Sequence, residues 1–107
     1  MARKMKHVGN RDRNEPEIVA EFECLGFYVI RMPRDAGFDL ICIGKGYTYI
    51  VEVKNPEVDW KITNEELEFA KKIREYGSES YVVLDKQDVQ DLISYGFSRW
   101  VYLFNET

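Results

Sequence analysis

The chain has 107 residues, of which 45% are hydrophobic and 32% are charged, and its formal net charge is −4. This composition predicts one soluble globular domain with a single modest core. No apolar run approaches the roughly 20 residues that a membrane span requires, and the basic N-terminus lacks the apolar stretch of a secretory signal. Because Cys24 and Cys42 stand singly within apolar patterns, we expect reduced core thiols in a cytoplasmic protein.

The charge is distributed unevenly along the chain. The first 13 residues carry five basic side chains and one acidic side chain, whereas the rest carries 10 basic and 18 acidic side chains. We therefore expect a basic flexible arm at residues 1–13 and a single domain at residues 14–107. The arm suits binding to phosphate groups, although a merely disordered tail fits equally well. Its basic residues are Arg3, Lys4, Lys6, Arg11 and Arg13.

The first expected element is a helix over residues 14–25. Asn14 is a favourable N-cap, Pro16 suits the first turn, and Gly26 is a usual stop. Apolar residues at i, i+4 and i+7 give this helix one buried stripe. They are Ile18, Phe22 and Leu25.

Three strands are expected next, and the last two form a hairpin. Residues 27–32 are rich in β-branched and aromatic side chains, which is typical of a strand. The apolar runs at 39–43 and 47–54 flank a glycine-rich turn at 44–46, which is a hairpin pattern.

The register of this hairpin decides where its charged residues lie. If all three residues at 44–46 form the turn, Asp39 lies level with Val51, one position from Glu52. A bulge or a slip of one residue would determine whether the Asp39 carboxylate lies near Glu52 or on the opposite face.

The second half of the chain predicts two more helices, each followed by a strand. Thr63 and Glu66 have the spacing of a capping box at the start of the first helix, and Asp85 caps the second. The strands are expected at 81–84 and 99–104. The whole order predicts an α/β domain with a mixed sheet, in which the three central strands are antiparallel.

Charged residues stand at the ends of the strands that should be most buried. Alternation within 47–54 places Glu52 and Lys54 on one face, and Asp39 opens the paired strand. A divalent cation would relieve the repulsion between two carboxylates, and hard oxygen ligands favour Mg²⁺ or Mn²⁺ over zinc. A lysine beside it could orient water or hold a phosphate oxygen, which suits phosphodiester hydrolysis. Solvated strand-end charges are the alternative interpretation.

These residues resemble a nuclease signature. The segment "GFDL" at 37–40 and "EVK" at 52–54 look like the PD-(D/E)XK motif. Together with "NEPEIVAEFECLGFYVIRM" and "ITNEELEF", they are most similar to stand-alone VRR-NUC modules, small replication-repair nucleases often found alone in phages. Archaeal Holliday-junction resolvases are the next most similar. The resemblance covers about residues 11–84 and implies a restriction-endonuclease-like αβββαβ core with helices on both faces of a mixed sheet.

The resemblance implies a catalytic set. Asp39 and Glu52 would bind Mg²⁺ or Mn²⁺ together with the backbone carbonyl of Val53, and Lys54 would be the catalytic lysine. The family usually has a proline where this chain has Phe38.

Two further acids are candidates for the same site. Glu17 matches the acid that such enzymes carry on the first helix, although its spacing from Asn14 also fits a capping box; Glu21 is the fallback. Glu66 stands where the family tends to have glutamine, so it either caps its helix or adds a ligand that favours a second metal.

The resulting functional prediction is a metal-dependent DNA endonuclease, structure-selective on branched or junction DNA and located in the host cytoplasm if phage-encoded. The alternatives are an inactive nucleic-acid-binding or assembly module of the same fold and a protein-interaction domain.

The expected partners follow from the charged and aromatic residues. Arg31 and Arg34 join the arm as expected phosphate contacts, and neither a membrane nor a small-molecule cofactor is expected. A homodimer is predicted because aromatic residues exceed the needs of one core. They are Trp60, Tyr95, Phe97, Trp100 and Tyr102.

Overall fold

The computed structural model describes residues 12–100. Its helices are α2 (Glu15–Cys24), α3 (Asn64–Glu75) and α4 (Lys86–Tyr95), with a 3₁₀ turn, η1 (Arg34–Ala36). Its strands are β1 (Tyr28–Arg31), β2 (Leu40–Gly44), β3 (Tyr47–Val53) and β4 (Ser80–Val83). This order confirms the predicted αβββαβ core. No helix in the described part is long and apolar enough to cross a bilayer.

The segments that were predicted for the two ends of the chain lie largely outside residues 12–100. Most of the basic arm precedes residue 12, and the expected strand at 99–104 begins with two residues in a turn, Arg99 and Trp100. Its other four residues are not among those described.

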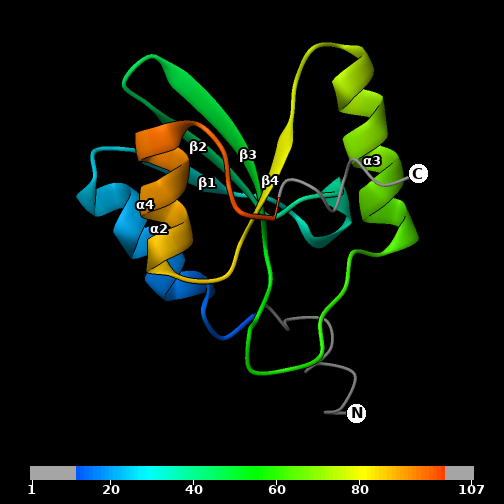
Figure 1. The fold of residues 1–107 in the computed structure, drawn as a ribbon, viewed down its shortest axis with the longest axis horizontal. Coiled ribbons are helices and arrows are strands. Elements are labelled where there is room, and N and C mark those ends of the chain that lie inside the picture. Colours follow the sequence, from blue (N-terminus) through cyan, green and yellow to red (C-terminus); the bar gives the residue numbers. More distant parts are fainter. Residues whose placement is uncertain (1–11, 101–107) are drawn as a thin grey trace.

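The four strands form one mixed sheet in the order β1-β2-β3-β4. The first two pairings are antiparallel, and β4 runs parallel to β3. Figure 1 shows α2 and α4 side by side on one face of the sheet and α3 on the other face. The predicted α/β class, with helices on both faces, is therefore confirmed.

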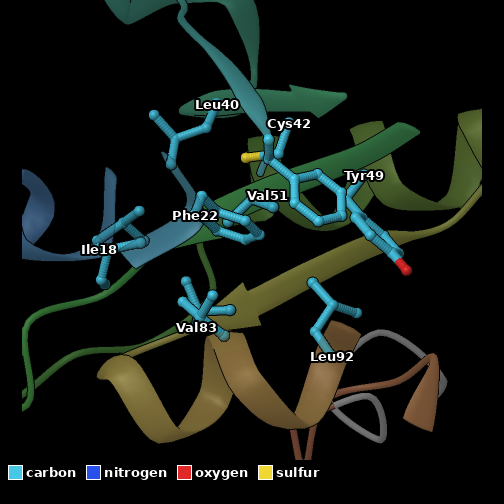
Figure 2. Close-up of a cluster of buried hydrophobic side chains, with 11 residues drawn as sticks. Ile18, Phe22, Leu40, Cys42, Tyr49, Val51, Val83 and Leu92 are labelled. Atoms are coloured by element: carbon cyan, nitrogen blue, oxygen red, sulfur yellow. The ribbon is translucent and has the colours of Figure 1, made fainter. Parts of the chain in front are cut away.

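The main core lies between the sheet and the pair of helices α2 and α4. The expected stripe of α2 supplies Ile18 and Phe22, both fully buried. In Figure 2 they point toward side chains of β2, β3 and β4, which meet Leu92 of α4 on the same side. A smaller cluster beneath α3 contains Ala70 and Val82. Because both faces carry an apolar layer, a charged residue inside the sheet needs a specific partner.

The hairpin between β2 and β3 has a tighter turn than expected. Only Lys45 and Gly46 lie outside the strands, with φ of 53° and 85°, as in a type I′ turn. Leu40 consequently pairs with Val51, one residue away from the expected register, which was wrong. Asp39 directly precedes this paired segment, and its side chain lines the same cavity as Glu52.

The expectation of two core thiols is correct for only one cysteine. Cys42 is fully buried in β2. Cys24 is exposed because the last residue of α2 turns away from the apolar stripe of that helix.

Candidate active site

A cavity of about 190 Å³ opens where β2 begins and β3 ends. Its lining includes six of the predicted site residues and adds two acids that the sequence had not indicated. The lining residues are Asp12, Glu15, Arg34, Asp39, Glu52, Val53, Lys54 and Glu66. The residues that were predicted as metal ligands or catalytic groups on β2 and β3 thus do meet at one place.

Asp39 is held firmly at the beginning of β2. Its backbone N–H donates to the carbonyl of Val51 at 3.1 Å, and its carbonyl accepts from the N–H of Met32 at 2.8 Å. Its side-chain Oδ2 accepts from the backbone N–H of Val53 at 2.7 Å. The carboxylate is therefore fixed against the end of β3, beside the residue whose carbonyl was predicted to bind a metal.

Lys54 lies between two carboxylates. Its Nζ is 2.9 Å from Oε1 and 3.1 Å from Oε2 of Glu66, and 3.7 Å from Oε2 of Glu52. Glu66 Oε1 also accepts from the backbone N–H of Thr63 at 2.9 Å, and Thr63 Oγ1 accepts from the N–H of Glu66 at 3.1 Å. The predicted capping box of α3, formed by Thr63 and Glu66, is confirmed. Glu66 is at the same time the ion-pair partner of Lys54.

The electrostatics of this group follow from its burial. Burial raises the pKa of Glu52 to about 11, and a hydrogen bond to Glu66 and the nearby charge of Asp39 act in the same direction. Burial opposes the charged form of Glu66 as well, but hydrogen bonds from Glu52, Thr63 and Lys54 lower its pKa overall. Burial would likewise lower the pKa of Lys54, yet its bonds to Glu66 raise it. The surroundings thus favour the charged forms of Lys54 and Glu66 and, while no cation is bound, disfavour the charged form of Glu52.

The acid from the first helix in this cavity is Glu15 rather than Glu17. Glu15 is only 2% exposed, and its Oε2 lies 3.5 Å from Nε of Arg31. Glu17 is exposed and lines a separate cavity, while Glu21 accepts a hydrogen bond from Gln90 of α4 at 2.9 Å. Neither Glu17 nor Glu21 lines the cavity that contains Asp39, Glu52 and Lys54.

The choice of Glu15 follows from helix geometry. Successive residues are rotated by roughly 100° about a helix axis, so residues three apart share a face. Glu15 is three residues before the buried Ile18, whereas Glu17 is one residue before it and points outward. Extending the apolar stripe backward by one turn would have identified Glu15 from the sequence.

Asn14 is the N-cap residue of α2, but its side chain makes no cap hydrogen bond. Its Nδ2 instead donates to the carbonyl oxygens of Lys54 at 2.8 Å and Leu84 at 2.7 Å. The predicted capping role of the Asn14 side chain is therefore wrong, and so is the alternative interpretation of Glu17 as part of a capping box with it. The carboxamide joins the beginning of α2 to the ends of β3 and β4 and so holds Glu15 over the cavity.

Asp12 is a second acid that the sequence analysis did not assign. In the sequence it is the single acidic residue among the first 13. Its side chain lines the cavity, and burial together with the charge of Asp39 raises its pKa. Its carbonyl accepts from the N–H of Glu15 at 3.0 Å, so the turn before α2 brings both acids to the same place.

The predicted phosphate contacts have different positions. Arg34 is exposed and lines the cavity, whereas Arg31 is paired with Glu15. Arg13 is exposed and lines the separate cavity that contains Glu17. The other predicted contacts lie outside the described residues; they are Arg3, Lys4, Lys6 and Arg11.

The carboxylates are close but are engaged with other groups. Within residues 12–100, no three acidic, histidine or cysteine side chains are arranged as a ready metal site. The contacts given above explain this, since Asp39 accepts from Val53 while Glu66 and Glu52 surround Lys54. Acids still outnumber bases in the cavity lining, by five carboxylates to Arg34 and Lys54.

Comparison with known proteins places this geometry in a known fold. No protein-family model and no curated protein matches the chain. A solved structure described as a "VRR_NUC domain" matches with a TM-score of 0.61 and 25% sequence identity, over 78% of this chain and 98% of that one. As the sequence resemblance implied, the chain has a VRR-NUC-like nuclease fold.

Proposed function

We propose that this protein is a Mg²⁺- or Mn²⁺-dependent endonuclease that hydrolyses phosphodiester bonds in DNA. One observation carries the proposal: Glu15 of α2, Asp39 directly before β2, and Glu52 and Lys54 at the end of β3 all line one cavity. The likeness to a VRR_NUC domain supports it. Incidental strand-end charges would be solvated, but Glu15 and Glu52 are only 2% and 5% exposed. Such burial of acids is costly and is typical of functional sites.

The donor set suits a hard divalent cation. The carboxylates of Asp39, Glu52 and Glu15 and the carbonyl of Val53 are all oxygen ligands, which Mg²⁺ and Mn²⁺ prefer. When bound, such an ion would stabilise charge on the phosphoryl group and make a water more acidic. We assign Glu66 a different role, since it already caps α3 and pairs with Lys54.

Lys54 is assigned to the phosphate. Its ammonium group is held by Glu66 at 2.9 Å and lies 3.7 Å from Glu52, so it is positioned as a hydrogen-bond donor. A donor fixed at this point can hold a phosphate oxygen and stabilise the negative charge that develops there during hydrolysis. An ion-paired ammonium is unsuited to accept a proton, so Lys54 is not the general base in this scheme.

The proposal includes branched DNA as substrate and a homodimer as the working unit. A junction has two scissile positions related by a two-fold axis, so paired cuts need two active sites. Tyr95 and Phe97 are 69% and 53% exposed and could form part of a contact between subunits. Trp60 and Trp100 instead pack edge-to-face at 5.2 Å within the cluster under α3, so most of their surface is used inside the subunit.

A cleavage assay on branched, flap and linear DNAs with Mg²⁺ or Mn²⁺ tests this function. Wild-type protein should cleave, and Glu52→Gln and Lys54→Ala should lose activity by orders of magnitude because the residues act as a unit. Glu17→Gln is the matched control, since this exposed acid lies on the same helix outside the cavity, and it should cleave normally. Binding of DNA without cleavage would favour an inactive module of the same fold.

The proposed homodimer has its own test. Sedimentation should give twice the 12.7 kDa chain mass if the dimer is correct.

A further inference from the structure

A second hollow, of about 340 Å³, adjoins the acidic cavity. We call it the Phe38 groove. It shares Arg34, Asp39, Glu52 and Glu66 with the cavity and adds Phe38 and Thr63. The two hollows therefore lie next to each other, on either side of the candidate catalytic acids.

Phe38 has an unusual setting for a residue beside an acidic site. Its ring stacks on the ring of Phe69 from α3, with centroids 5.1 Å apart and planes 20° apart. Gly37 makes this possible, because its φ of 97° turns the backbone, and a Cβ there would lie 3.2 Å from the Phe69 ring. Phe38 remains only half-buried, and it lines the groove. The Phe69 ring thus packs against the Phe38 ring, while part of Phe38 stays accessible in the groove.

The charge of the groove selects what can enter it. Its charged lining comprises five carboxylates, from Asp35, Asp39, Glu52, Glu65 and Glu66, and one guanidinium, from Arg34. Lys54, which is proposed to hold the phosphate in the cavity, does not line the groove, so the groove itself disfavours a phosphate. A nucleobase is neutral, its amino groups can donate to carboxylates, and its flat face stacks on aromatic rings.

We propose that Phe38 binds an unpaired nucleobase next to the scissile phosphate and so gives the enzyme a preference for DNA with unpaired nucleotides at the cut. This inference rests on the proposed nuclease function and names the feature of the substrate that the same site reads. Phe38 directly precedes Asp39, so their Cα atoms are only about 3.8 Å apart. A base in a continuous duplex is stacked on its neighbours and cannot offer its face, whereas a base at a flap or branch can.

The test compares two DNAs of the same sequence, one a continuous duplex and one with unpaired nucleotides at the cleavage position. Phe38→Leu keeps an apolar contact with Phe69 but removes the ring, and Phe38→Tyr keeps the ring. Tyr28→Leu is the matched control, because Tyr28 is a 69% exposed aromatic residue on β1 that does not line the groove. Thermal unfolding establishes that each variant is folded, and Phe38→Met replaces Phe38→Leu if the latter is not.

Phe38→Leu should raise KM for the unpaired substrate about tenfold, the order expected for loss of one base–aromatic stack. It should leave kcat for that substrate and both constants for the duplex within about twofold. Phe38→Tyr and Tyr28→Leu should match the wild type. A second readout without cleavage is the fluorescence of 2-aminopurine at the unpaired position, which stacking quenches. Quenching should be seen with wild-type protein and lost with Phe38→Leu.

The outcomes separate this inference from the function on which it rests. If wild-type protein cleaves DNA while Phe38→Leu shows unchanged KM on both substrates and unchanged quenching, the base-binding role is overturned and the nuclease stands. An equal loss on both substrates would also overturn it, because it would show a general structural role. If the wild type cleaves none of the DNAs, the proposed function and this inference both fall.

Discussion

The carboxamide of Asn14 joins α2 to the carbonyl of Lys54 at 2.8 Å, across 40 positions in the sequence. A second bond from the same nitrogen reaches Leu84 at 2.7 Å. One side chain therefore fixes the first turn of α2, where Glu15 lies, to the strand that carries the candidate catalytic lysine. Oδ1 of Asn14 has no hydrogen-bond partner among residues 12–100, so its contribution comes from the donor side of the amide.

The role of Asn14 is tested by comparing two substitutions. Asn14→Ala should lower the free energy of unfolding by about 2 kcal/mol, because two backbone carbonyls lose their donor. Asn14→Asp should be at least as harmful, since it places a carboxylate against the same two carbonyls. An N-cap role makes the opposite prediction, because aspartate caps helices as well as asparagine does. Urea unfolding of the three proteins gives the answer, and a fully stable Asn14→Asp would exclude the strand contact as the main role.

Glu66 should behave as the partner of Lys54 and as a helix cap. Glu66→Gln can still accept from Thr63 but lacks the charge that pairs with Lys54, so cleavage should fall about tenfold with little change in stability. Glu66→Ala loses the cap too and should unfold about 1 kcal/mol more easily. Affinity for Mn²⁺, measured by calorimetry, should be nearly the same in Glu66→Gln and wild type. A large loss of Mn²⁺ affinity would instead make Glu66 a metal ligand.

Divalent cations should stabilise the folded protein. A ligand that binds only the folded state stabilises it by mass action, by about 2.7 kcal/mol at a concentration 100 times its dissociation constant. Mg²⁺ or Mn²⁺ at millimolar concentration should therefore raise the melting temperature of the wild type. Asp39→Asn and Glu52→Gln should abolish the rise, whereas Glu17→Gln should keep it. If the melting temperature of the wild type does not change when Mg²⁺ or Mn²⁺ is added, the proposed site is contradicted.

The buried Glu52 should make metal-free stability depend on pH. Its pKa is raised by burial from 4.5 to about 11, so the folded protein retains a proton that the unfolded chain releases. The stability that this group supplies is fully present below pH 4.5 and declines as the pH rises toward 11. Glu52→Gln removes this dependence and should melt at a higher temperature than wild type at pH 8 in a chelator. Melting curves at pH 5 and pH 8 test this, and a variant that melts lower than wild type at both would refute it.

Local patterns in the sequence determined most of the secondary structure. The stripe of Ile18 and Phe22 depends only on helical spacing, and the capping box of Thr63 and Glu66 joins residues three apart. Such features require no information about distant parts of the chain, so they could be predicted. The same holds for the hairpin and for the gathering of acids at the ends of its strands, which the nuclease resemblance also indicated.

The tertiary structure decided which residues make up the candidate site. A turn at residues 44–46 can close in two ways, and the observed closure pairs Leu40 rather than Asp39 with Val51. The Asp39 carboxylate consequently shares a cavity with Glu52. Glu15 and Glu17 are both acids in the first turn of α2; the apolar stripe indicates which one faces the sheet, but only the packing of the helix shows that Glu15 lies over a cavity shared with Asp39 and Glu52. Asn14 meets partners 40 and 70 residues away. Rotating a helix about its axis, or shifting a strand by one residue, changes local energies little but reverses the face on which a side chain lies. The packing of the whole chain therefore has to select the rotation and the register.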